Sequence, residues 1–216
     1  IYKDKFLDIA KIGLPAGIQG TVFSLSNVVI QSSVNSFGSI VMAGNGAAAN
    51  IEGFVYSAMN AFYQACLTFT GQNYGANKLE RINRILLVCQ ICVIVVGVVM
   101  GFGCYFGGRV LLGIYSTDAA VIDAGMIRLK YVCLTYALCG IMDVFVGSLR
   151  GLGYSVMPMI VSLLGACALR LVWIATIFQA VHTLENLYVS YPISWIITSS
   201  VHFICFIIIR IKIGKK

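Results

Sequence analysis

Charged residues are scarce in this sequence. Asp, Glu, Lys and Arg make up 11% of the 216 residues, against about 25% in an ordinary soluble domain. Low charge argues against a water-soluble enzyme, and it also argues against disorder, which needs high charge and low hydrophobicity. Only three prolines occur, and no low-complexity tract is present, so a linker or fibrous protein does not fit either.

Motifs for catalysis and metal binding are missing as well. No G-x-x-x-x-G-K-[ST] run occurs, and His182 and His202 are too far apart for a ligand pair. Cys89 and Cys92 form a C-x-x-C, but no second ligand pair accompanies them, so we interpret the cysteines as small apolar residues. We therefore expect no enzyme, no cofactor and no metal site.

Apolar residues dominate the chain instead, at 59% of the sequence. A membrane-spanning helix needs about 20 mainly apolar residues, and six stretches meet this length. The expected spans are residues 12–36, 45–70, 85–106, 121–149, 156–178 and 187–209. Nothing alternates like the strands of a barrel. We predict an all-α integral membrane protein, a six-transmembrane-helix bundle that forms a single lobe over residues 1–216.

The net charge of +7 is explained by orientation once the basic residues are sorted by side of the membrane. The side that would hold both termini contains Lys3, Lys5, Lys11, Lys78, Arg81, Arg84, Arg150, Arg210, Lys212, Lys215 and Lys216. The other side would hold only Arg109, Arg128 and Lys130. The positive-inside rule then places both termini in the cytoplasm. We expect a multi-pass protein of the plasma membrane (the bacterial inner membrane), with the lipid bilayer and not nucleic acid as its partner.

Polar residues recur every four positions in three of the six spans. Such a spacing puts side chains on one face of a helix. The three stripes are Asn27, Gln31 and Asn35; Glu52, Tyr56, Asn60 and Gln64; and Tyr131, Thr135, Cys139 and Asp143. We expect them to line a shared interior or a wet cavity. The alternative is that amides join helices to one another, as is common in membrane bundles.

Two carboxylates and one arginine fall deep inside the predicted spans: Glu52, Asp143 and Arg170, with Arg150 at an edge. An ionised group at mid-bilayer costs about 2.5–3.5 kcal/mol on insertion scales. These side chains should therefore face inward. One interpretation is that the acids exchange a proton for a cation, as in a coupled transporter. The other is that they pair with Arg170 or cap a helix.

Small residues four apart let helices approach closely. The sequence contains four G-x-x-x-G pairs: Gly13/Gly17, Gly97/Gly101, Gly103/Gly107 and Gly147/Gly151. They predict helix packing and carry no information about a substrate.

Several motifs, in order, resemble the MATE (multidrug and toxic compound extrusion) family. They are Leu14-Pro15-Ala16-Gly17, Ala43-Gly44-Asn45, Asn50-Ile51-Glu52-Gly53, Gly71-Gln72-Asn73-Tyr74-Gly75-Ala76 and Leu149-Arg150-Gly151-Leu152-Gly153, followed by Pro158 and Arg170. The resemblance implies a twelve-helix transporter of two six-helix lobes that exports organic cations in exchange for H+ or Na+. This chain resembles the C-terminal lobe, so we expect the N-terminal lobe to be missing from it and to be its partner.

The resemblance also suggests roles for residues. Glu52 and Asp143 would couple the cation, and Arg150 and Arg170 would be structural charges. Amphipathic organic cations or drugs would contact a cleft formed by Asn27, Gln31, Tyr56, Asn60, Gln64, Tyr131 and Thr135. This lobe's first helix lacks the acid that some members use there. The alternatives are a flippase or exporter of lipid-linked precursors of the same superfamily, and a six-helix membrane protein that transports nothing.

Overall fold

A computed structural model describes residues 3–214 of the chain. Its helices are α1 (Lys3–Asn35), α2 (Ser39–Gly75), α3 (Glu80–Phe106), α4 (Gly108–Gly113), α5 (Ala119–Val132), α6 (Tyr136–Gly151), α7 (Val156–Ser162), the π-helix η1 (Leu163–Ala168), α8 (Leu169–Ala175), α9 (Ile177–Ala180) and α10 (Leu184–Gly214). No strand occurs among these residues. The prediction of an all-helical membrane bundle is therefore confirmed.

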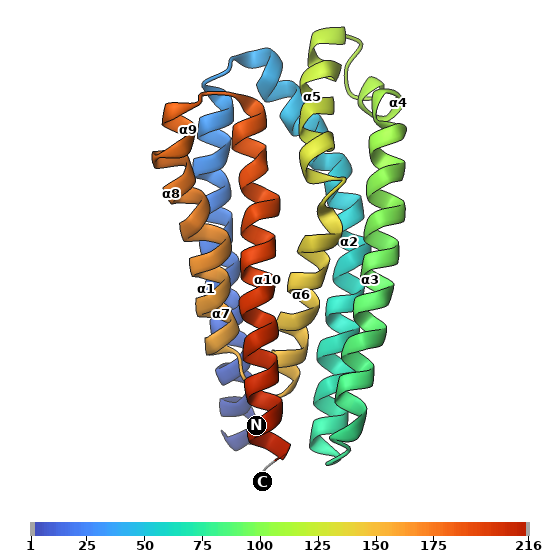
Figure 1. Cartoon of the computed structure of the whole chain (residues 1–216), viewed down its shortest axis with the longest axis vertical. Coiled ribbons are helices and arrows are strands. Elements are labelled where there is room, and N and C mark those ends of the chain that lie inside the picture. Colours follow the sequence, from blue (N-terminus) through green and yellow to red (C-terminus); the bar gives the residue numbers. More distant parts are fainter. Residues whose placement is uncertain (1–2, 215–216) are drawn as a thin grey trace.

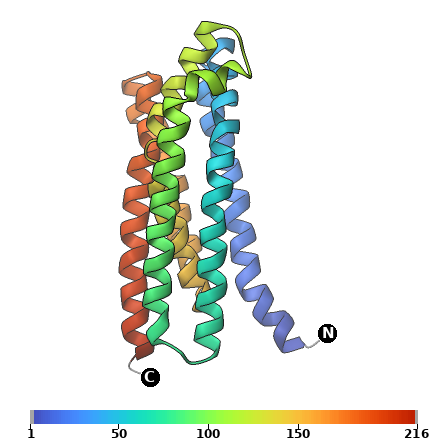
Figure 2. The ribbon, with the colours of Figure 1, turned by 90° about the vertical axis from the view of Figure 1, so that its right-hand side faces the viewer.

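The long helices run side by side, with α5 and α6 in the middle (Figure 1). They pack against α2 and α3 on one side and against α10 on the other. The described ends of α1 and α10 lie at the same end of the bundle, together with the α2–α3 connection (Figure 1). The first turns of α1 lean away from the other helices (Figure 2).

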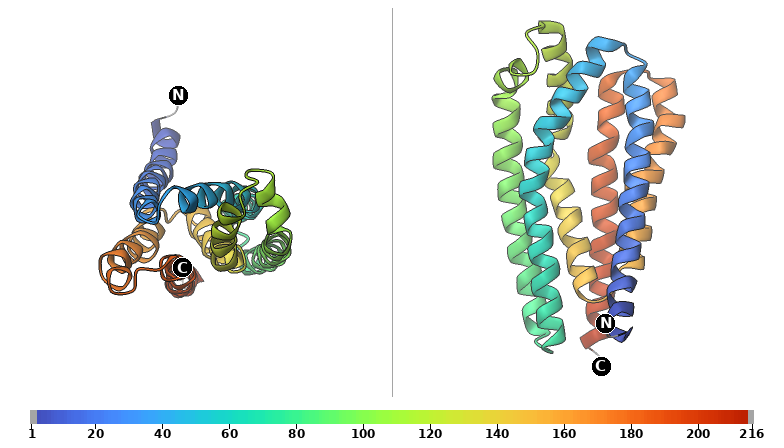
Figure 3. Two further views of the ribbon diagram at one scale, coloured as in Figure 1. Left: turned by 90° about the horizontal axis from the view of Figure 1, so that it is seen from above. Right: turned by 180° about the vertical axis from the view of Figure 1, so that it is seen from behind.

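Helix α1 is the least enclosed of the long helices. In its apolar part, Ile9–Asn35, the most hydrophobic window is only 11% buried. Seen from above, α1 and the α7–α10 segment form one group beside α2–α6 (Figure 3). Large apolar side chains such as Leu14, Leu25 and Val28 remain exposed along α1.

Four helical segments of the described chain are long and apolar enough to cross a membrane: Ile9–Asn35, Glu80–Phe106, Val156–Ala180 and Leu184–Gly214. The bent pair of α5 and α6 makes a fifth if it counts as one span. Helix α2 is longer than any of them, at 37 residues, but is less apolar because it carries the polar stripe from Glu52 to Gln64. The chain is a multi-pass membrane protein.

The expected continuous helix over 121–149 is wrong. Helices α5 and α6 meet at a bend of 47°, and residues 133–135 form a turn between them. Neither Pro nor Gly lies at this break. The bend coincides with a close contact: a Cβ atom on Gly101 of α3 would collide with the Cys133 carbonyl. The neighbouring helix therefore approaches the bend at a position only glycine can occupy.

Two of the four G-x-x-x-G pairs make close helix contacts. A Cβ atom on Gly97 would lie 2.9 Å from the Cα atom of Ala137, and Gly101 meets Cys133. On α6, Gly147 and Gly151 face the backbone of α2 at Tyr63 and Leu67. No such neighbour lies within 4 Å of Gly13, Gly17 or Gly103 among the described residues. These two pairs bring α3 close to the α5–α6 bend and bring α6 close to α2.

The run Arg150-Gly151-Leu152-Gly153 ends α6 and reverses the chain. Gly153 has a φ of 86°, which L-residues rarely adopt. Its N–H donates to the Arg150 carbonyl at 2.9 Å, and the Tyr154 N–H donates to the Leu149 carbonyl at 3.0 Å. This pair of bonds is a Schellman motif. The Ser155 hydroxyl then donates to the Ile12 carbonyl at 2.8 Å, which ties the turn to α1.

Candidate functional site

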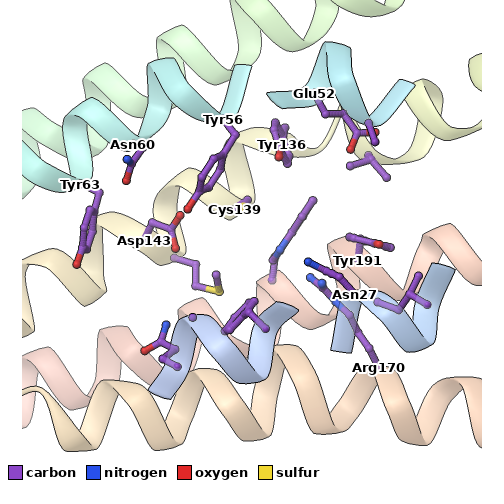
Figure 4. A pocket seen from close by; sticks show the side chains of 18 of the residues that line it. Asn27, Glu52, Tyr56, Asn60, Tyr63, Tyr136, Cys139, Asp143, Arg170 and Tyr191 are labelled. Atoms are coloured by element: carbon purple, nitrogen blue, oxygen red, sulfur yellow. The ribbon is translucent and has the colours of Figure 1, made fainter. Parts of the chain in front are cut away.

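A cavity of about 620 Å³ lies between α1, α2, α5, α6, α8 and α10. Such a volume suits a drug-sized ligand. Its walls combine aromatic rings with amide and charged side chains, a lining rare for a membrane interior (Figure 4). Both predicted carboxylates, Glu52 and Asp143, line it, as do Arg128, Arg150 and Arg170.

Glu52 is held in an ion pair at one end of this cavity. The Arg128 Nε and Nη2 atoms donate to its two carboxylate oxygens at 2.8 and 2.7 Å. Only 4% of the Glu52 surface and 9% of the Arg128 surface is exposed. A bidentate pair of this kind fixes both the orientation and the charge of its members.

Asn45 extends this pair into a network that joins four helices. Its side-chain oxygen accepts hydrogen bonds from Arg128 Nη1 at 2.7 Å and from the Tyr188 hydroxyl at 2.9 Å. Its Nδ2 atom donates to the Gln31 side chain at 2.8 Å. Helices α1, α2, α5 and α10 are therefore connected through one buried amide.

Asp143 lies in a different environment. Among the side chains that the structure describes, none donates a hydrogen bond to its carboxylate or forms an ion pair with it. Figure 4 shows it between Tyr56, Asn60 and Cys139, with the Tyr56 hydroxyl turned toward it. Arg150 acts on it electrostatically without direct contact. Asp143 thus keeps its oxygen atoms available to the cavity.

Arg150 and Arg170 are both buried, with 7% and 4% of their surfaces exposed. Arg150 donates to the Tyr63 hydroxyl at 2.7 Å and to the Gln19 side chain at 2.8 Å. Arg170 donates from Nε to the Ser194 hydroxyl at 2.8 Å. Its guanidinium carbon lies 4.2 Å from the centre of the Tyr191 ring, a cation–π distance.

Most of the residues that the sequence predicts to line a cavity or to be buried charges lie together in the structure. Asn27, Gln31, Tyr56 and Asn60 line the cavity, as do the four charged residues Glu52, Asp143, Arg150 and Arg170. Gln64, Tyr131 and Thr135 are not among the lining residues. The bend explains two of these three differences, because positions four apart share a face only within a continuous helix. The Thr135 hydroxyl instead donates to the Tyr131 carbonyl at 2.6 Å.

Arg128 is the main residue that sequence reasoning missed. It was expected at the membrane surface opposite the termini, whereas it lies inside the bundle against Glu52. Arg150, expected at the surface beside the termini, also points into the bundle. The expectation that Arg170 would be the sole buried cation is therefore wrong, and so is its pairing with an acid. A buried Glu52 demands a cation, but the partner is 76 positions away, so spacing could not identify it.

No group of three or more His, Cys, Asp or Glu side chains within the described residues could hold a metal ion. The eight cysteines are free thiols. A transition-metal or structural zinc site therefore has no candidate ligand set in residues 3–214, and the polar chemistry of the chain is concentrated in the cavity.

Comparison with known proteins identifies this arrangement. The family model MatE matches residues 15–176, which include nearly every side chain of the cavity. The chain belongs to the MatE family. A curated relative, the probable multidrug resistance protein YpnP of Bacillus subtilis, is 25% identical over 162 residues, which are 75% of this chain and 36% of YpnP.

Solved structures agree with this MatE assignment at the level of the fold. A MATE protein crystallised with MaL6 superposes with a TM-score of 0.90 at 14% identity, over 100% of this chain and 49% of that one. A MOP superfamily transporter of Pyrococcus furiosus is described as having a binding pocket of reversed polarity. It superposes with a TM-score of 0.82 at 16% identity, over 90% of this chain and 43% of the Pyrococcus chain. The chain thus spans about a third of this curated relative and about half of the solved chains. It has the fold of one lobe of such a transporter.

Proposed function

We propose that this chain is the C-terminal half of a secondary active multidrug efflux antiporter. The transporter would export amphipathic organic cations in exchange for H+ or Na+. The observation that carries the proposal is Asp143, a carboxylate in a cavity within the membrane that no described side chain neutralises by direct contact. The multidrug resistance relative YpnP supports the same function.

The two acids take different parts in this proposal. Asp143 would bind the coupling ion, because its oxygens are open to the cavity and Tyr56 and Asn60 flank it (Figure 4). An ionised carboxylate is costly in a low-dielectric site, and a proton that neutralises it or a cation that pairs with it removes that cost. Glu52, already neutralised by Arg128, would keep the helices in register. Asn27, Gln31 and Tyr56 would contact the substrate.

A second lobe is required for this function. Alternating access needs two bundles that rock about a site between them. The exposed apolar side chains of α1, such as Leu25 and Val28, provide a face for such a neighbour. We propose that an N-terminal lobe covers it and completes the cavity.

Orientation in the plasma membrane follows from the basic residues at the end of the bundle that carries both described termini. At that end Lys78 lies in the α2–α3 connection and Arg81 in the first turn of α3, while Arg210 and Lys212 lie in the last turns of α10 (Figure 1). Moving Arg150 and Arg128 into the interior removes one cation from each side, so the excess is unchanged. We propose that this end faces the cytoplasm.

A second candidate function is supported by the charge of the cavity. Three arginines line it against two carboxylates, and the Pyrococcus neighbour is described as having a different function because of its reversed pocket polarity. A flippase or exporter of lipid-linked precursors would suit such a pocket. A membrane protein without transport activity fits the open Asp143 less well.

Efflux by the complete gene product tests both candidates. Inverted vesicles are placed in a solution of an organic cation such as ethidium, which an exporter would move into them, and are given a sodium gradient and a pH gradient separately. Ethidium movement driven by either gradient supports the antiporter and names the ion. Indifference to ethidium together with movement of a fluorescent lipid-linked sugar would favour the second candidate.

A further inference from the structure

Arg170 is the one cavity arginine with no carboxylate near it in the described chain. Arg128 is paired with Glu52, and Arg150 interacts electrostatically with Asp143. The neighbours of Arg170 are neutral: the Ser194 hydroxyl and the rings of Tyr191 and Trp195.

The guanidinium of Arg170 is also incompletely bonded. Its Nη2 atom is fully buried and has no hydrogen-bond partner among the described residues, and the side chain as a whole is only 4% exposed. A buried cation without a counter-charge is costly, and stacking on aromatic rings offsets only part of that cost. The remaining donors have a fork geometry that suits a planar or tetrahedral oxyanion.

The surroundings of Arg170 can complete such a site. Figure 4 shows the Asn27 side chain next to the Arg170 guanidinium and on the same side of the cavity. The Ser194 hydroxyl accepts a hydrogen bond from Arg170 Nε at 2.8 Å. The Tyr191 ring packs against the guanidinium, with its centre 4.2 Å from the guanidinium carbon. The charged group is thus oriented before any ligand arrives, which lowers the entropy cost of binding.

We propose that Arg170, assisted by Asn27, is a binding subsite for the carboxylate or phosphate group of an amphipathic ligand. The inference rests on the proposed function and specifies its substrate class. A ligand that places a cationic group at Asp143 and an anionic group at Arg170 would satisfy both buried charges at once. The preferred substrates are then zwitterionic and not purely cationic.

The experiment compares two dyes that differ in one charge. Rhodamine 110 has a free carboxylate, and rhodamine 123 is its methyl ester. Fluorescence anisotropy measures the binding of each dye to the complete gene product in lipid nanodiscs. The wild-type chain should bind rhodamine 110 about tenfold more tightly than rhodamine 123, the amount expected for a hydrogen-bonded charge.

Variants assign that preference to one side chain. Arg170→Gln should remove it by weakening rhodamine 110 binding about tenfold while rhodamine 123 binding changes less than about twofold. Arg170→Lys should retain part of the preference. Arg109→Gln, which removes an exposed arginine far from the cavity, should leave both affinities unchanged.

The outcomes separate this inference from the proposed function. Equal affinities for the two dyes in the wild-type chain, weakened together by Asp143→Asn, would overturn the anionic subsite and leave the proposed function standing. Failure of both dyes to bind would count against both. If the Arg170 variants do not fold, the wild-type comparison still decides the matter.

Nanodiscs of two compositions identify the source of the anion. One set contains phosphatidylcholine alone, and the other also contains phosphatidylglycerol. A preference that persists in both sets assigns the site to the substrate's carboxylate. A preference that disappears only with phosphatidylglycerol shows that a lipid phosphate occupies the same subsite. Both results support an anion site at Arg170.

Discussion

Arg128 and Glu52 face each other across α5 and α2, joined by two parallel hydrogen bonds of 2.7 and 2.8 Å. Both side chains are buried, and Asn45 links them to α1 and α10 through Gln31 and Tyr188. The pair therefore connects α2 to α5 at one end of the cavity. Further along the cavity, the Asp143 carboxylate has no hydrogen-bond or ion-pair partner among the described side chains.

Removal of one member of this pair should destabilise the fold. Glu52→Gln leaves the Arg128 charge buried without a counter-ion, and we expect a loss of about 3–5 kcal/mol in the free energy of unfolding. Denaturation of the purified chain in detergent micelles measures it. Glu185→Gln, at an exposed position, is the control and should change stability by less than about 0.5 kcal/mol.

The double variant Glu52→Gln with Arg128→Met provides an internal check. Because it removes the charge and its partner together, it should be more stable than the sum of the two single losses indicates. Strict additivity of the two single changes would show that the side chains do not interact, which contradicts the ion pair.

Glycines on α3 make a second, independent prediction. Gly101→Ala places a methyl group against the Cys133 backbone, and we expect a loss of about 1–3 kcal/mol from overpacking. Gly103→Ala, two residues further along α3, meets no atom within 4 Å. It should stabilise the helix by about 0.5–1 kcal/mol. Equal melting temperatures for the two variants would contradict the close approach at the bend.

The helices could be predicted from hydrophobic runs, but the bend between α5 and α6 could not. The sequence Cys133-Leu134-Thr135 contains neither Pro nor Gly, and the residue packed against the bend, Gly101, lies 32 positions earlier in the chain. The cavity was largely predictable, because i, i+4 polar stripes persist in straight helices. The prediction failed at Tyr131 and Thr135, where the helix bends, and at Gln64 of α2.

Orientation of the chain is testable by thiol labelling in intact cells. Thr117→Cys, in the connection between α4 and α5, should react with a membrane-impermeant maleimide added outside. Lys78→Cys, in the α2–α3 connection at the other end, should react only after the membrane is opened. The wild-type chain reports labelling of the native cysteines. The reverse pattern would contradict cytoplasmic termini.

Transport by the 216-residue chain alone is not expected, because alternating access needs a second bundle. Reconstituted into liposomes, the chain should give the same ethidium flux as empty liposomes under a sodium or pH gradient. The complete gene product serves as the positive control. Gradient-dependent flux from the isolated chain would contradict the assignment as one lobe.

The most direct test of the central claim is ethidium efflux by the complete gene product carrying Asp143→Asn. The amide preserves shape and removes the ionisable oxygen, so gradient-driven efflux should fall to background at normal expression. Asp123→Asn, an exposed acid paired with Arg109, should keep efflux near the wild-type rate. Full, gradient-driven efflux with Asp143→Asn would contradict the role of Asp143 as the coupling carboxylate.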